Sequence, residues 1–279
     1  MASNLVVCLH EISLVDPHAT KVLYLFAIGG IPCNRMFKHV ALLVRKPSLT
    51  HEEFLEYWQQ HHTPLARDIE GVVRYHTVYP TNPAHSEFDG IAELYFETLE
   101  DLHAALGHPE SRDYDPTREV AAKARADVDN FLDIERRPRF IGEEVVQKDD
   151  VGGDTDGLYK HSAFLVRKTG MSHDEFRQYW EHEHTPLARE IEGVVRYHTV
   201  YPTEPEVSEF DGVAELYFST LDDLHAALGH PDSRDYDPTK EIAAKARADV
   251  DNFLAIERRP RVIGQEVVQK NDIVGREGY

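Results

Sequence analysis

Cysteine is scarce in this chain of 279 residues, which contains only Cys8 and Cys33. Both lie ahead of the part of the sequence that repeats, so that part has no disulfide framework and no thiol nucleophile. Scarce cysteine is typical of proteins in reducing compartments, and we expect this protein in the cytoplasm.

Long apolar runs and an excess of positive charge are also missing. No apolar segment reaches the roughly 20 residues that a membrane-spanning helix needs. Asp and Glu number 50 against 30 Lys and Arg, which gives a formal net charge of −20. This charge opposes binding to the phosphates of nucleic acid or to an anionic membrane surface. We therefore expect neither nucleic acid nor a membrane as a partner.

The most informative feature that is present is a tandem repeat. Phe37 to Asp149 align with Tyr159 to Asn271 at a constant offset of 122 residues, and 86 of the 113 pairs are identical. Such self-similarity indicates duplication of one domain. Residues 5–9 and 21–28, which precede the repeats, are apolar enough to form short strands. The expected divisions are an N-terminal extension over 1–36, a first repeat over 37–149, a flexible linker over 150–158 and a second repeat over 159–272.

Each repeat has the predicted order β-α-β-β-α-β. In the first repeat, apolar and β-branched runs predict strands over residues 39–45, 72–79, 90–96 and 139–146. Helices are expected between the first two strands and, in two pieces, between the last two. This is the order of a ferredoxin-like domain, an antiparallel sheet with helices on one face. Because the other face must be covered, we predict an α+β protein whose two sheets meet and enclose one barrel within the chain.

The first helix of each repeat carries the most distinctive pattern. It opens with a capping box at residues 50–53 and again at 172–175. Pro64 is expected to kink or end the helix near His62. Four side chains at spacings of four, four and three residues form one stripe that must face the sheet: Phe54, Trp58, His62 and Leu65.

These residues resemble a known family. The motif Phe54-x-x-Tyr57-Trp58, followed by His62-Thr-Pro-Leu65 and preceded by Arg45-Lys46, is similar to the EthD domain of the dimeric α+β barrel superfamily. The resemblance covers both repeats. It implies a small enzyme without a cofactor, because family members include dehydratases, decarboxylases and cyclases that act on polyketide-like compounds.

His62, with its counterpart His184, is the leading candidate for a catalytic role. A neutral imidazole at the end of the inward stripe can act as general base or general acid near pH 7. The alternative is a core histidine that binds a backbone carbonyl beside Pro64. The resemblance favours catalysis, and we expect Trp58 and Trp180 on the same stripe to line the substrate pocket.

The strand over residues 72–79 supplies further candidates. Its alternation places Arg74 and His76 on one face and Tyr75 on the other, and periodicity does not decide which face lines the cavity. His76 and His198 are therefore second catalytic candidates. The candidates for substrate binding beside the two tryptophans are Arg74, Arg196, Tyr75, Tyr197, His39 and His161.

Carboxylates next to these histidines open two further alternatives. Asp89 and Glu93 are four residues apart and fall on one face of the strand that follows the turn, where a carboxylate can orient a histidine or pair with an arginine. His62, His76 and Glu93 are also types of residue that bind divalent ions, but no spacing supports a metal site and we expect none. No phosphate-binding Gly-rich loop and no nucleophile elbow is present.

The resemblance to the EthD domain, together with these candidate residues, implies a lyase or cyclase that needs no cofactor. Dehydration, decarboxylation and aldol-type ring closure of a polyketide-like or aromatic compound all require proton transfer next to a carbonyl. Two alternatives remain, a non-catalytic protein that binds a small molecule and a cofactor-free monooxygenase. The sequence is also compatible with a homodimer of such two-domain chains.

Overall fold

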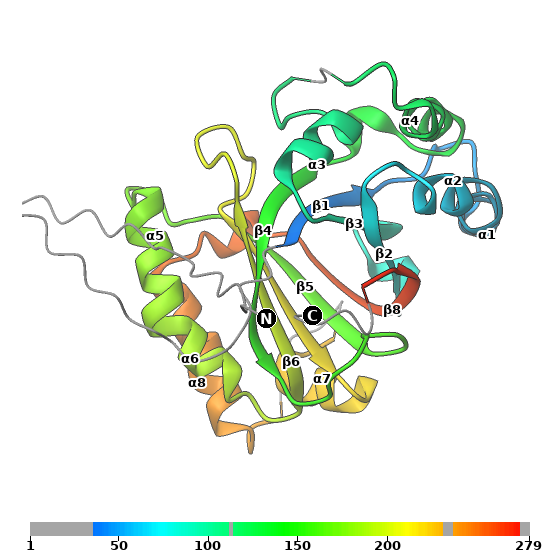
Figure 1. Ribbon diagram of the computed structural model, residues 1–279. Coiled ribbons are helices and arrows are strands. Elements are labelled where there is room, and N and C mark those ends of the chain that lie inside the picture. The colour runs from blue at the N-terminus through cyan, green and yellow to red at the C-terminus, as the bar shows by residue number, and fades with distance from the viewer. Residues whose placement is uncertain (1–35, 112–113, 231–236, 274–279) are drawn as a thin grey trace, which may run out of the picture.

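The computed structural model describes residues 36–111, 114–230 and 237–273, so the strands expected within residues 1–35 lie outside the described part. Eight antiparallel strands form a closed barrel, and the helices of the two repeats cover it on the outside (Figure 1). The strands are β1 (Met36–Leu43), β2 (Val72–Pro80), β3 (Gly90–Phe96), β4 (Arg139–Asp149), β5 (Tyr159–Leu165), β6 (Val194–Pro202), β7 (Gly212–Phe218) and β8 (Arg261–Asn271).

The barrel closes within one chain, as the duplicated sequence predicts. Each repeat contributes four neighbouring strands, in the order β4-β1-β3-β2 and β8-β5-β7-β6. The last strand of each repeat is long enough to belong to both sheets. In β4, Phe140 pairs with Val40 of the same repeat, whereas Val146 pairs with His198 of the other repeat. The strands β8 and β2 close the opposite seam in the same way.

The helices pack on the outer faces of the two sheets (Figure 1). No helix within the described residues is long and apolar enough to cross a membrane. The α-helices of the first repeat are α1 (His51–Tyr57), α2 (Thr63–Arg67), α3 (Leu99–Leu106) and α4 (Glu119–Phe131). Those of the second are α5 (His173–Tyr179), α6 (Thr185–Arg189), α7 (Leu221–Leu228) and α8 (Glu241–Asp249).

Pro64 does not end the first helix. A π-helical turn over Trp58–His62 joins α1 to α2, and the backbone N–H of Thr63 donates to the carbonyl of Trp58. Pro64 then lies in the first turn of α2, where its missing N–H costs little. The second repeat has the same π turn over Trp180–His184. Such turns are frequent at functional sites, and this one ends on the candidate histidine.

The capping boxes are formed as the sequence predicts. The hydroxyl of Thr50 accepts from the N–H of Glu53 at 3.2 Å, and the Glu53 carboxylate accepts from the N–H of Thr50 at 2.8 Å. Ser172 and Glu175 make the same two contacts.

We expect Thr50→Ala and Ser172→Ala each to lower the free energy of unfolding by about 1 kcal/mol, measured by urea denaturation. Thr169→Ala is the matched control on an exposed turn, and equal stability of all three variants would contradict the capping role.

Both faces of every sheet are buried, because helices cover one face and the opposite sheet covers the other. Phe54, Trp58 and Tyr75 belong to the helix-side core of the first repeat. Val40 and Phe140 belong to a separate core inside the barrel, to which both repeats contribute. Strand β3 is consequently buried along its whole length. Gly90 opens this strand because a Cβ there would lie 2.5 Å from the Trp58 ring.

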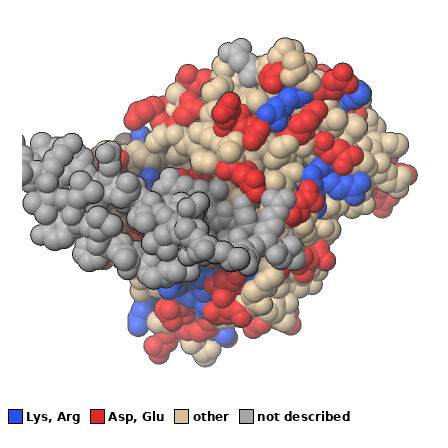
Figure 2. Space-filling model, viewed as in Figure 1, with Lys and Arg blue, Asp and Glu red and all other residues tan. Residues whose placement is uncertain are grey.

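The outer surface is strongly acidic. Figure 2 shows Asp and Glu side chains spread over both visible halves of the molecule, with fewer Lys and Arg among them. This distribution agrees with the formal net charge of −20.

Candidate functional site

Each repeat contains a cavity between its helices and the outer face of its sheet. The cavity of the first repeat has a volume of about 90 Å³ and that of the second about 300 Å³. A larger hollow of about 610 Å³ beside Gly170 and His182 is a shallow groove with mostly exposed walls. The helix–sheet cavities are better suited to hold a small molecule, since their walls are largely apolar and enclosed. Their apolar lining in the first repeat includes Ala41, Leu43, Trp58, Ala92, Leu94 and Phe131.

His62 lines the first cavity and has a carboxylate partner. Its Nδ1 lies 2.9 Å from Oδ2 of Asp127, and the ring packs on Phe131 with 4.9 Å between centroids. A carboxylate only accepts hydrogen bonds, so Nδ1 carries the hydrogen and Nε2 is left to exchange a proton. The imidazole is 12% exposed. His62 is therefore not a core histidine that binds only a backbone carbonyl.

Asp127 is itself held in place. The hydroxyl of Tyr57 donates to its Oδ1 at 2.7 Å, and the amide of Asn130 donates to the same oxygen at 3.0 Å. The hydrogen bond from His62 is the main reason why the pKa of Asp127 falls to about 2. Asp127 therefore stays ionised at neutral pH and can stabilise a protonated His62.

The second repeat reproduces the pair. His184 Nδ1 lies 2.9 Å from Oδ2 of Asp249, and Tyr179 donates to Oδ1 of Asp249 at 2.7 Å. Burial lowers the pKa of His184 below its ordinary value, although Asp249 acts in the opposite direction. The imidazole is consequently neutral at pH 7, which is the form a general base needs.

Polar groups lie elsewhere on the cavity wall. His39 is buried, and its Nδ1 makes no hydrogen bond within the described residues. Burial, followed by the charges of Arg139 and Arg137, holds the pKa of His39 well below its usual range. Both arginines line the cavity together with Arg125. Positive charge beside an uncharged imidazole suits a substrate with a negatively polarised oxygen. In the second repeat, His161, Arg259, Arg261 and Arg247 line the cavity.

The tryptophans and the strand tyrosines belong to this cavity as well. Trp58 lies in its wall, and its indole N–H donates to the hydroxyl of the buried Tyr75 at 3.2 Å. In the second repeat Trp180 and Tyr197 both line the cavity, with 3.3 Å between the indole nitrogen and the hydroxyl. Tyr75 thus supports the wall, and Tyr197 is part of it.

His76 and Arg74 lie on the opposite side of the sheet. They share a strand with Tyr75, and since alternate residues of a strand face opposite ways, they point into the barrel. His76 Nδ1 approaches Glu266 at 3.1 Å, and His198 Nδ1 approaches Glu144 at 3.2 Å. The structure therefore separates these two histidines from the cavities of His62 and His184. Arg74 lies over the ring of Tyr95, whereas Arg196 binds Asp149 and the carbonyl of Gly153.

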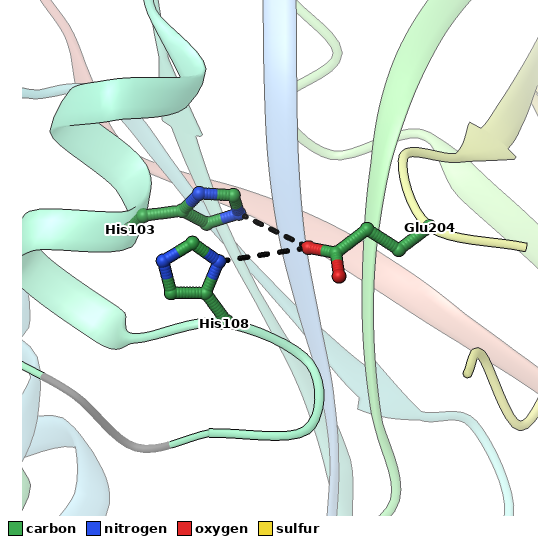
Figure 3. Close-up of side chains that lie close together, drawn as sticks. All are labelled: His103, His108 and Glu204. Carbon is green, nitrogen blue, oxygen red and sulfur yellow. Dashed lines mark ion pairs between the residues drawn. The ribbon is translucent and has the colours of Figure 1, made fainter. Parts of the chain in front are cut away.

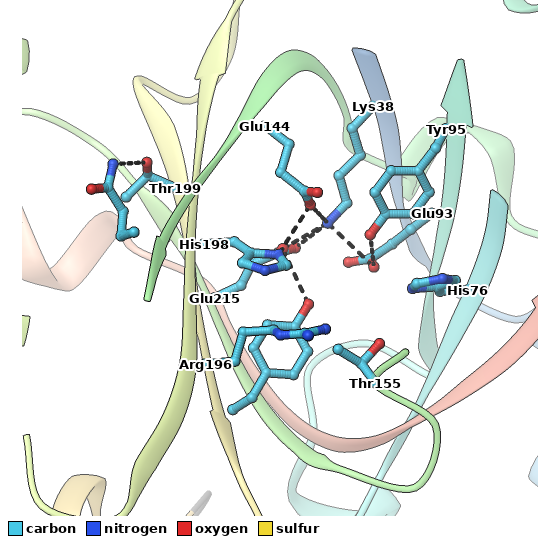
Figure 4. A network of polar contacts seen from close by, with 12 residues as sticks. Lys38, His76, Glu93, Tyr95, Glu144, Thr155, Arg196, His198, Thr199 and Glu215 are labelled. Atoms are coloured by element: carbon cyan, nitrogen blue, oxygen red, sulfur yellow. Dashed lines mark hydrogen bonds and ion pairs between the residues drawn. The ribbon is translucent and has the colours of Figure 1, made fainter. Parts of the chain in front are cut away.

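The barrel interior holds a network of charges that the sequence did not predict (Figure 4). Lys38 Nζ lies 2.6 Å from Glu215, and Lys160 Nζ lies 2.7 Å from Glu93. Lys160 also contacts Glu266 at 2.8 Å. Lys38 therefore binds a glutamate of the other repeat, and Lys160 binds one glutamate from each repeat. The side chains of both lysines and of these three glutamates are fully buried. Burial, and then the charge of Glu215, raises the pKa of Glu93 to about 8.

Neither Asp89, which directly precedes β3, nor Glu93 within β3 joins a site around His62. Asp89 binds Arg45 and lies 3.4 Å from His51, so it holds the start of the first helix. Glu93 points into the barrel. His76 and Glu93 do lie close together, in a group with Glu266 inside the barrel. His62 does not join them, because it lines the cavity on the other side of the sheet.

Sequence reasoning missed several residues of the cavity. The sequence gives no sign of the carboxylate partners Asp127 and Asp249, and it marks Tyr57 only as part of the family motif, without its contact to Asp127. The arginines of the cavity wall were also missed. In each repeat they come from the second helical region and from the segment just before the last strand: Arg125, Arg137 and Arg139, with counterparts Arg247, Arg259 and Arg261.

Comparison with known proteins identifies the family. The model of the EthD domain matches residues 46–135 and 168–257. No curated protein matches the chain. Among solved structures, an anthrone oxidase-like protein superimposes with a TM-score of 0.52 at 12% identity, over 87% of this chain and 96% of that one. At this identity the likeness concerns the fold, and it supports the barrel architecture.

Two further structures are similar to a lesser degree. An EthD family protein of Bacillus halodurans C-125 is 23% identical over 39% of this chain and 99% of its own, with a TM-score of 0.32. Chlorite dismutase of Candidatus Nitrospira defluvii is 11% identical over 83% of this chain and 90% of its own, with a TM-score of 0.48. The matches to the domain model cover more than half of the sequence and fall once in each repeat. This chain belongs to the EthD family and carries two copies of the domain in tandem.

Proposed function

We propose that this protein is an acid–base enzyme, a lyase or cyclase that needs no cofactor and acts on a small, partly apolar, oxygenated compound. The observation that carries the proposal is the His62–Asp127 pair in the wall of an apolar cavity, repeated as His184–Asp249. A polyketide-like or aromatic substrate suits the apolar lining. A protein that only binds a ligand needs no histidine oriented by a carboxylate, so this pair favours catalysis.

The proposed chemistry begins with removal of a proton from a carbon next to a carbonyl. Nε2 of His62 accepts that proton, and ionised Asp127 stabilises the imidazolium. The electrons move to the carbonyl oxygen, where Arg137 and Arg139 offset the developing negative charge. The protonated His62 then returns its proton to a departing hydroxyl in a dehydration, or to the new alkoxide in an aldol-type ring closure.

An oxygenase that needs no cofactor is the second candidate. The similar fold of the anthrone oxidase-like protein supports it, and the first step is the same. A substrate that has lost a proton to His62 is electron-rich enough to react with O₂ in an apolar cavity. The two candidates differ in whether O₂ is consumed.

The experiment that tests both is solvent exchange followed by NMR. The protein is incubated in D₂O with a panel of β-dicarbonyl and hydroxyaromatic compounds, with an oxygen electrode in a parallel sample. We expect accelerated deuterium incorporation next to the carbonyl of at least one compound, and none with the His62→Gln/His184→Gln variant. O₂ uptake would select the oxygenase. Metabolite profiles of cells with and without the protein supply further compounds, and no exchange with any of them would contradict the proposal.

A further inference from the structure

A group of three metal-binding side chains lies outside both cavities, at a contact between the two repeats (Figure 3). His103 belongs to α3, His108 follows in the next loop, and Glu204 follows β6 of the other repeat. We propose that these three residues form a site for a divalent transition ion, with Zn²⁺ as the natural occupant, and that each chain has one such site.

The distances are close to those of a coordination shell. Oε1 of Glu204 lies 3.8 Å from Nε2 of His103 and 3.6 Å from Nδ1 of His108. All three ligand atoms lie within 4.8 Å of one another. Ligand atoms around a tetrahedral Zn²⁺ lie roughly 3.3 Å apart, given metal–ligand bonds of about 2.0–2.1 Å. Small rotations of the three side chains would bring their ligand atoms to this spacing.

The environment of each ligand fits such a site. Nε2 of His103 is buried and makes no hydrogen bond within the described residues. His108 and Glu204 are 46% and 40% exposed, so an ion can enter without any opening of the fold. Two imidazoles and one carboxylate prefer Zn²⁺ and its neighbours in the first transition row over Mg²⁺ or Ca²⁺. A water molecule would fill the fourth position.

The second repeat supplies an internal comparison. His225 and His230 stack like the first pair, with ring centroids 3.9 Å apart against 3.8 Å. The position of Glu204, however, is Asn82 in the first repeat. Asn82 borders the same hollow as Arg261, and Arg261 donates to the carbonyl of His230 at 2.6 Å. The position equivalent to Glu204 thus holds an amide in the first repeat, and the described residues at these two places form one full ligand set, that of His103, His108 and Glu204.

The proposed site adjoins the cavity of the first repeat. Arg139, which lines that cavity, donates to the carbonyls of Leu106, His108 and Pro109. An ion bound by His108 would therefore fix the segment that holds Arg139, and it would also tie α3 to the other repeat. This inference stands on the ligand geometry and does not depend on the proposed enzymatic function.

The test is calorimetric titration of the full, chelator-treated chain with ZnCl₂, and with MgCl₂ as the control ion. Wild type should bind Zn²⁺ at this site and gain thermal stability, whereas Glu204→Gln should weaken binding by about 10-fold or more. His103→Ala should do the same, and His225→Ala should leave binding unchanged. Asn82→Glu should add a second Zn²⁺ per chain, because it places a carboxylate at the position equivalent to Glu204.

Circular dichroism of each variant shows whether it is folded, which is expected because Glu204 and Asn82 lie at the surface. The proposal is overturned if wild type binds no Zn²⁺, or if Glu204→Gln and His103→Ala bind it as wild type does. Loss of binding in His225→Ala but not in His103→Ala would assign the ion to the other repeat and would also overturn it.

Discussion

Replacing both His62 and His184 with glutamine is expected to reduce turnover by about 10²-fold or more, the usual scale for removal of a general acid or base. Each imidazole lines a cavity and is oriented by an ionised carboxylate, Asp127 or Asp249. Glutamine keeps the size and polarity of the side chain, so the variant should fold. The measurement is the initial rate with a substrate found by the exchange experiment, together with circular dichroism of the variant.

The single variants show whether both repeats are active. If the two cavities act independently, His62→Gln alone should leave roughly half of the wild-type turnover, because the second general base remains. Complete loss in one single variant would mean that only one repeat is catalytic. His61→Gln is the matched control, since His61 is exposed and its counterpart is Glu183. Undiminished turnover in the folded double variant would end the case for these histidines.

The dependence of the rate on pH offers a separate check of this assignment. Burial lowers the pKa of His184, so its neutral form persists to a lower pH than that of a free histidine. A variant that retains only His184 should therefore reach half of its maximal rate below about pH 6.5, the ordinary pKa of histidine, and lose activity as the pH falls further. Replacing Asp249 with Asn removes the carboxylate that stabilises the imidazolium, so the rate should fall while the fold persists. An unchanged rate would show that Asp249 has only a structural role.

The barrel could be predicted because the repeat and the strand pattern both constrain it. Each copy has a sheet with one uncovered face, and the two uncovered faces can pack against each other because the linker holds the copies together. The capping boxes at Thr50 and Ser172 could also be read directly, since both partners of each box lie within four residues. Local patterns of this kind survive in the structure because nothing in the tertiary contacts opposes them.

The His–Asp pairs could not be predicted in the same way. His62 and Asp127 lie 65 residues apart, and their contact depends on how α4 packs against the π turn. Asp127 precedes Phe131 by one helical turn, and Phe131 is the ring on which His62 packs. That spacing indicates a shared helix face. It does not reveal that the face meets a histidine from another helix.

The two faces of β2 illustrate a second limit. Alternation correctly separates Tyr75 from Arg74 and His76, but it presents the two faces as alternatives for the lining of a single cavity. The structure has a cavity on the helix side and a charged core inside the barrel, so both faces are buried. The partners in that core come from the other repeat, which is why the pairing of Glu93 with Lys160 could not be inferred from either repeat alone.

Replacing Lys38 with methionine is expected to lower the free energy of unfolding by about 3–5 kcal/mol. Lys38 is fully buried, and its ammonium contacts Glu215 at 2.6 Å, Glu93 at 3.3 Å and Glu144 at 3.5 Å. Methionine nearly fills the space but leaves these carboxylates without one of the two ammonium groups in the barrel. Such a loss is a large part of the 5–15 kcal/mol that typically stabilises a folded domain. Guanidinium denaturation measures it.

An exposed ion pair supplies the control. Arg177 lies 3.8 Å from Glu181, with the two side chains 46% and 38% exposed, so Arg177→Met should change stability by no more than about 1 kcal/mol. If Lys38→Met lowered the free energy of unfolding by no more than this control, the buried charge network would not stabilise the barrel as its geometry indicates.

The double variant Lys38→Met/Glu215→Gln separates lost attraction from uncompensated charge. It removes one positive and one negative group, so the balance of charge in the barrel stays that of the wild type. Because most of the cost of losing one partner is the unpaired charge that remains, the double variant should be more stable than Lys38→Met alone. Lys38 and Glu215 belong to different repeats, so the coupling energy between them measures how strongly the charged core joins the two halves of the barrel. A double variant less stable than Lys38→Met would mean that Glu215 stabilises the barrel through its other contacts, among them the one with Lys160 at 3.1 Å.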